Sequence, residues 1–111
     1  MKKIEAIIRE SKFSEVKTAL NNVGVNFFSY WDVNSVNTEN ESASLIANDK
    51  QDTIKKCYLS ILVNDDFEDV TIKAILDSAV TGENGDGRIF ISSINEIYKI
   101  RTKEKGPRTL R

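Results

Sequence analysis

The sequence predicts a single α+β domain built from two β-α-β halves. Two segments, 2–9 and 54–63, alternate apolar and polar residues with the period of a half-buried strand. Each is followed by a segment whose apolar residues recur every three to four positions, which indicates an amphipathic helix. A length of 111 residues, with 40% hydrophobic and 30% charged residues, fits one globular domain with one core.

The first half begins with the strand over 2–9. The helix after it is indicated by four apolar residues spaced as one helical face, namely Val16, Ala19, Leu20 and Val23. Gly24 supplies the residue that ends such a helix, because glycine readily takes a positive φ. Residues 25–34 are rich in β-branched and aromatic side chains, and we expect them to form the second strand.

The second half begins with the strand over 54–63. Asp65 and Glu68 have the spacing of a capping box, and apolar periodicity then predicts a helix that ends at Ala79. A glycine-rich loop and two short strands, 88–92 and 94–100, complete the chain. Two halves of this kind predict a ferredoxin-like antiparallel sheet with both helices on one face and an extra C-terminal strand. We expect the uncovered face to be buried between subunits.

Residues 34–53 join the two halves, are polar and show neither the strand nor the helix period. A stretch of about 20 residues without secondary structure is uncommon inside a compact domain and is usually either functional or disordered. Because the flanking strands are well defined, we favour a functional, exposed loop.

Charge and cysteine content exclude several classes of protein. A net charge of -1 argues against binding to nucleic acid through a broad basic face. Residues 94–111 hold six basic and two acidic side chains, a net charge of +4, and include the basic tail at 101–111. Such a charge could bind an anionic ligand or a partner chain, or it could simply form a solvated face. One cysteine, Cys57, and no histidine leave no intramolecular disulfide and no thiolate or imidazole metal site. The lack of an apolar signal sequence predicts a cytoplasmic protein.

The loop over 81–88 carries the clearest functional signal. Its three glycines, Gly82, Gly85 and Gly87, can take positive φ and bring backbone N–H groups close to a phosphate, and Arg88 adds a cation. A plain turn is the alternative, because Asp-Gly is a strong turn signal. The absence of histidine and of a Gly-Lys-Ser/Thr run argues against a nucleotide-hydrolysing enzyme.

Residues 79–90 resemble the T-G-x-x-G-D-G-[KR]-I-F signature of the PII signal-transduction proteins. Residues 1–9, 16–24 and 100–104 also resemble segments of that family. PII proteins are homotrimers that bind ATP or ADP between subunits and are not enzymes. They sense the adenylate state and usually 2-oxoglutarate. They act on ammonium transporters, enzymes or regulators through a long loop. The resemblance implies the same fold, a nitrogen-related role and an effector loop at 34–53.

The resemblance also implies a nucleotide site. Its residues would be Ile7, Ser29, Lys56, Leu62, Gly82, Gly85, Asp86, Gly87, Arg88, Lys99 and Arg101. Lys99 and Arg101 stand where the family has two arginines that reach the phosphates across the subunit boundary. Ser29 and Leu62 match positions near the adenosine, whereas Ile7 and Lys56 match positions near the phosphates and the 2-oxoglutarate site.

Residues 35–41 depart from the family, most of whose members open the loop with G-x-G-R-Q-K-G. Glu39 could coordinate Mg²⁺, but without the ion it would repel a γ-phosphate or a dicarboxylate, so sensing of 2-oxoglutarate is doubtful. The loop has no tyrosine that could be uridylylated. The alternative is a divergent sensor of another small anion, such as bicarbonate or a cyclic nucleotide, coupled to a different transporter.

Overall fold

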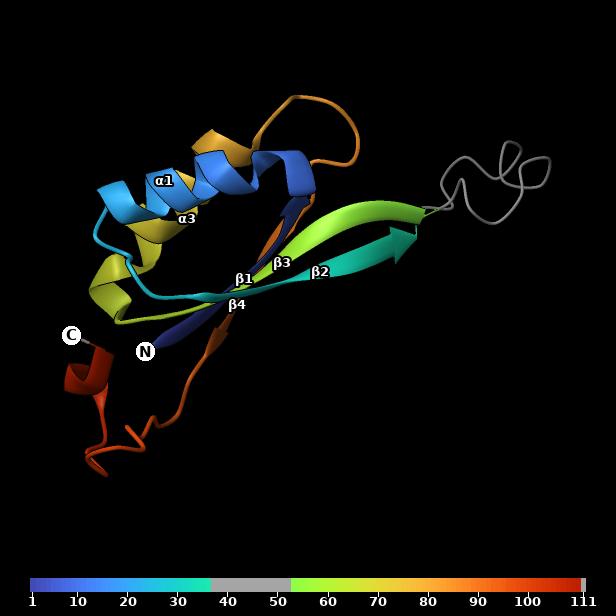
Figure 1. The fold of residues 1–111 in the computed structure, drawn as a ribbon. Helices are drawn as coiled ribbons and strands as arrows, with labels where there is room; N and C mark the ends of the chain where they lie inside the picture. The colour runs from blue at the N-terminus through green and yellow to red at the C-terminus, as the bar shows by residue number, and fades with distance from the viewer. Residues whose placement is uncertain (37–52, 111) are drawn as a thin grey trace.

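The computed structural model describes residues 1–36 and 53–110, which form one sheet with two helices on one face (Figure 1). The elements in chain order are β1 (Lys2–Arg9), α1 (Phe13–Asn22), β2 (Ser29–Val36), β3 (Thr53–Val63), α3 (Glu68–Ala79) and β4 (Arg88–Ser93). Short 3-10 turns lie at 10–12, 65–67 and 107–110.

The strands are ordered β2-β3-β1-β4, and every neighbouring pair is antiparallel. This order and the two helices on one face confirm the α+β ferredoxin-like fold predicted from the sequence. The register places Ile4 of β1 opposite Ile61 of β3 and Ile91 of β4, so one apolar row crosses three strands. The central strand β1 therefore fixes the positions of both its neighbours.

The core lies between the sheet and the two helices. Alternate residues of β1 and β3 are buried there as predicted, namely Ile4, Ala6, Ile8, Cys57, Leu59, Ile61 and Val63. Helix α1 ends in a Schellman motif, in which the Val25 amide donates to the Leu20 carbonyl at 2.9 Å and Gly24 has φ +88°. Leu20 and Val25 are both buried, so the motif also closes one end of the core.

The second strand begins later than predicted. Residues 25–28 are irregular because the Schellman motif directs Val25 into the core, and β2 starts only at Ser29. Pairing continues to Val36 opposite Thr53, so both ends of the segment 34–53 belong to strands. The remainder of the predicted loop, 37–52, lies outside the described residues.

The capping box predicted for Asp65 and Glu68 is wrong. A 3-10 turn over 65–67 moves the start of α3 to Glu68, and the helix has no side-chain cap. The Asp65 carboxylate instead accepts a hydrogen bond from the Met1 amine at 2.8 Å. This ion pair lowers the pKa of Asp65.

The predicted strand over 94–100 is also wrong, because the sheet formed by the described residues ends at β4. Past Ser93 the chain leaves the sheet (Figure 1) and folds on itself. The Lys103 amide donates to the Lys99 carbonyl at 2.7 Å, and the Lys99 amide donates to the Glu104 carbonyl at 2.8 Å. These local bonds use backbone groups that a further strand would offer to the sheet, and only a single bridge, Tyr98 to Lys105, forms.

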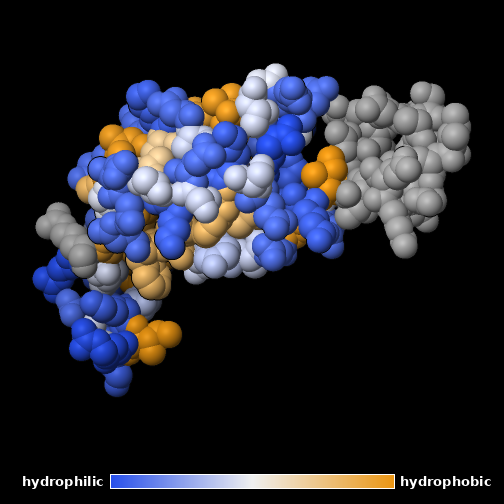
Figure 2. All heavy atoms as spheres, turned by 45° about the horizontal axis from the view of Figure 1, so that its top comes forward, coloured by the Kyte–Doolittle hydropathy of each residue, from blue (hydrophilic) through white to orange (hydrophobic). Residues whose placement is uncertain are grey.

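The two sides of the sheet differ in character. Seen with the helices turned towards the viewer (Figure 2), the surface is mainly hydrophilic and its apolar residues form separate patches. The uncovered side carries an aromatic row in which Trp31 stacks on Tyr58 with ring centroids 4.5 Å apart, and Phe90 approaches Tyr58 edge-on at 6.1 Å. Tyr58 donates a hydrogen bond to Glu5. Trp31 and Phe90 are exposed in the single chain.

Candidate functional site

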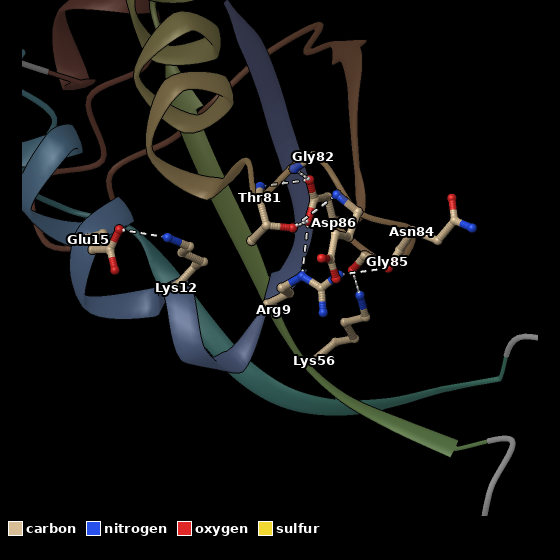
Figure 3. Close-up of polar contacts among 10 residues, drawn as sticks. Arg9, Lys12, Glu15, Lys56, Thr81, Gly82, Asn84, Gly85 and Asp86 are labelled. Atoms are coloured by element: carbon tan, nitrogen blue, oxygen red, sulfur yellow. Dashed lines mark hydrogen bonds and ion pairs between the residues drawn. The ribbon is translucent and has the colours of Figure 1, made fainter.

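The glycine-rich loop between α3 and β4 is organised around the carboxylate of Asp86 (Figure 3). Its oxygens accept hydrogen bonds from the Thr81 amide at 2.8 Å, the Gly82 amide at 2.9 Å and the Thr81 hydroxyl. Arg9 of β1 adds an ion pair, with its Nε 3.0 Å from Asp86 Oδ1. The Thr81 hydroxyl and amide and then Arg9 hold the pKa of Asp86 well below its usual range. Asp86 therefore shapes the loop.

The lowered pKa of Asp86 predicts an acid-dependent loss of stability. Ionised Asp86 stabilises the folded loop above the ordinary carboxyl pKa of about 4, and this contribution disappears as the pH falls from there through the lower folded-state pKa. We expect urea unfolding at a series of pH values below about 4 to show that the free energy of unfolding falls more steeply with decreasing pH for the wild type than for Asp86→Asn. Equal slopes for the two proteins would contradict this assignment.

Two cations anchor the same loop from the uncovered face of the sheet. Arg9 and Lys56 are directly opposite each other on β1 and β3. Arg9 Nη2 donates to the Asn84 carbonyl at 2.7 Å, and Lys56 Nζ donates to the Gly85 carbonyl (Figure 3). Lys56 is only 4% exposed. Burial and then the charge of Arg9 lower the pKa of Lys56, whereas Asp86 acts in the opposite direction.

Gly87 brings the end of the loop against β1. It has φ +98°, and a Cβ at this position would lie 1.7 Å from the carbonyl oxygen of Ile7. Gly85 also has φ +98° and lies beneath the side chains of Arg9 and Lys56. Glycine is thus required at position 87 because the loop backbone passes close to β1 there. The main chain of Ile7 is the part of β1 that it approaches.

The first group of predicted site residues gathers at this end of the sheet. Ile7 pairs with Arg88, whose side chain is exposed at the start of β4. Ile7, Asp86, Gly87 and Arg88 line a groove of about 390 Å³ that continues over the apolar residues of α3. Lys56 and Gly85 lie next to it through their mutual hydrogen bond.

The second group lies elsewhere. Ser29, Leu62 and Lys99 line a cavity of about 840 Å³ between the start of β2, the end of β3 and the C-terminal segment. Leu62 pairs with Lys3 of β1 and Lys56 with Arg9, so six residues of extended strand, about 20 Å, separate the two groups. Arg101 is exposed in the turn that follows Lys99. A single chain does not bring all the predicted residues together.

Sequence reasoning missed Arg9, which contributes more contacts to the loop than any predicted cation does. Its residue type gave no signal by itself. Alternation within 2–9 places it on the same face as Ile7, but only the register with β3 brings it beside Lys56. Glu39, the one candidate metal ligand, lies outside the described residues. Among the residues that the structure describes, no group of three or more metal-binding side chains occurs.

A model of the family described as nitrogen regulatory protein P-II matches residues 1–104. The chain belongs to the P-II (PII) family. The P-II protein of Bradyrhizobium diazoefficiens is 39% identical over 108 residues, which cover 96% of both chains. P-II 2 of Methanothermobacter thermautotrophicus is 38% identical, with 99% of this chain and 97% of the relative covered. The resemblance stated from the sequence is confirmed.

A third relative of this P-II protein carries a more specific name. The "Nitrogen fixation nifHD region GlnB-like protein 1" of Methanothermococcus thermolithotrophicus is 40% identical, with 96% of this chain and 99% of the relative covered. The relatives are thus regulators connected with nitrogen. Within 1–36 and 53–110, none of the helices has the length and apolar character needed to cross a membrane.

Proposed function

We propose that this P-II protein is a cytoplasmic, non-enzymatic regulator that binds ATP or ADP in clefts between the subunits of a homotrimer. It controls a nitrogen-related transporter or metabolic enzyme through residues 34–53. The observation that carries this function is the loop held by Asp86, Arg9 and Lys56, with Arg88 exposed beside it. Loops of this kind present N–H groups to a phosphate, and arginine can add a bidentate contact.

The separation of the two groups of site residues supports a site shared between copies. The loop end of one subunit would receive the phosphates, and Lys99 and Arg101 of a neighbour would reach the same phosphates. Ser29 and Leu62 of that neighbour would lie near the adenosine. The aromatic row on the uncovered sheet face supplies apolar surface for the association of subunits. Mg²⁺ would accompany the phosphates, whereas the altered stretch 35–41 gives no support for 2-oxoglutarate.

Titration calorimetry with ATP, ADP and AMP tests this function. We expect the wild type to bind ATP and ADP. Arg88→Ala should lower the affinity about tenfold to a hundredfold, because it removes a charge-assisted phosphate contact. Lys17→Ala removes an exposed cation of α1 and serves as the control. Absence of binding heat for the wild type, or equal affinities for Arg88→Ala and wild type, would overturn the proposed site.

A second candidate is a sensor of another small anion, which the paired cations Arg9 and Lys56 favour. A thermal-shift screen with bicarbonate, cyclic AMP, 2-oxoglutarate and the adenylates separates the two functions. Stabilisation by bicarbonate or cyclic AMP without any response to ATP or ADP would favour this candidate. A clear response to 2-oxoglutarate would contradict the idea of a divergent sensor.

A further inference from the structure

We propose that the Lys56 amine is a site of reversible carbamate formation with CO₂. Three observations single it out among the described lysines: it is 4% exposed, it lies directly opposite an arginine on the neighbouring strand, and its Nζ is held by a loop carbonyl. An ordinary surface lysine has none of these features. Unlike arginine, lysine changes its pKa readily when it is buried.

The geometry places Arg9 where the new group would form. A Cβ added to Gly85 would lie 3.3 Å from Arg9 Nη2 and 3.6 Å from Lys56 Nζ, so both nitrogens lie above the same glycine. Directly opposed strand residues have Cβ atoms about 5 Å apart. A carboxylate attached to Nζ would therefore be within reach of the Arg9 guanidinium.

The chemistry requires the neutral amine. Burial and the charge of Arg9 both lower the pKa of Lys56, which increases the neutral fraction. The Nζ lone pair attacks the carbon of CO₂, an N–C bond forms, and the π electrons of one C=O bond move to its oxygen. Nitrogen then releases one proton to solvent. The product is a carbamate with one negative charge, and nothing is oxidised or reduced.

The loop retains its attachment in the product. A carbamate nitrogen keeps one N–H, which can still donate to the Gly85 carbonyl. Arg9 has five N–H donors, of which the contacts to Asp86 and Asn84 use Nε and Nη2. The Asp86 carboxylate would repel the negative charge of the carbamate, but its oxygens are already engaged by Thr81, Gly82 and Arg9. Lys56 would change from a cation to an anion beside the candidate phosphate site.

The test uses the full chain without nucleotide. The protein is equilibrated with ¹³C-labelled CO₂, trapped with triethyloxonium and digested, and tandem mass spectrometry locates the label. We expect label on Lys56 at several times the level of Lys55, its exposed neighbour. Lys56→Arg should lose that label, Lys55→Arg should keep it, and Arg9→Gln should reduce it. Equal label on the two lysines, or none on Lys56, would overturn the assignment.

The wild-type comparison of Lys56 with Lys55 decides the question even if a variant misfolds. A further consequence rests on the proposed nucleotide site: CO₂ should weaken ATP binding to the wild type but not to Lys56→Arg. Labelling and nucleotide titration are separate measurements, so ATP binding without label contradicts only the carbamate. Label without ATP binding contradicts only the nucleotide function.

Discussion

Gly87→Ala is expected to lower the free energy of unfolding by about 3 kcal/mol or more, a large part of the stability of a small domain. Alanine would have to adopt φ +98° and place its Cβ 1.7 Å from the Ile7 carbonyl oxygen. That oxygen belongs to the backbone of β1, which is paired on both sides and cannot move without disturbing the sheet. Urea unfolding followed by circular dichroism measures the loss.

Gly82→Ala is the matched control. Gly82 also has a positive φ, +88°, but an added Cβ would meet nothing within 4 Å. We therefore expect only the backbone cost of about 1 kcal/mol for alanine in this conformation. Equal losses for the two variants would show that φ alone matters and that the close approach to β1 does not.

Asp86→Ala is expected to weaken ATP binding about tenfold or more, although it removes a negative charge from the vicinity of the phosphates. The loop loses the acceptor that joins Thr81, Gly82 and Arg9, and a displaced binding loop typically costs affinity on this scale. Simple electrostatics predicts the opposite sign, because an acid repels a phosphate. The direction of the change therefore separates the two explanations.

Asp77→Ala removes an acid from α3 that pairs with Lys73 on the surface, and it should leave ATP affinity unchanged. Titration calorimetry on both variants and the wild type gives the comparison. Tighter binding by Asp86→Ala would contradict the role of this carboxylate as the organiser of the loop.

Residue patterns within short segments of the sequence correctly predicted strands β1 and β3 and the end of helix α1. Alternation identified β1 and β3 because one face of each strand is buried under the helices, and Gly24 marked the end of α1 through its positive φ. The late start of β2 was not predicted, because the burial of Val25 depends on the Schellman motif. The absence of a strand over 94–100 follows from hydrogen bonds within 97–106, which alternation does not reveal.

The candidate site shows the same limit. The glycine pattern identified the loop, yet the functions of Arg9 and Asp86 depend on which residues become neighbours across strands. Arg9 is 77 positions from Asp86 in the sequence, and Lys56 is 29 positions from Gly85. Lys56 looks like an ordinary strand lysine until the loop covers it. Contacts between residues so far apart in the sequence depend on the register of the paired strands.

The central claim is that one nucleotide site is divided between two subunits, and mixing two inactive variants tests it most directly. Arg88→Ala and Arg101→Ala should each bind ATP poorly. When the two are unfolded together and refolded as an equal mixture, random assembly should restore about one quarter of the clefts, because those clefts receive Arg88 from one variant and Arg101 from the other. Calorimetry should detect these restored sites at near wild-type affinity. A mixture that binds no better than the separate variants would contradict a site shared between subunits.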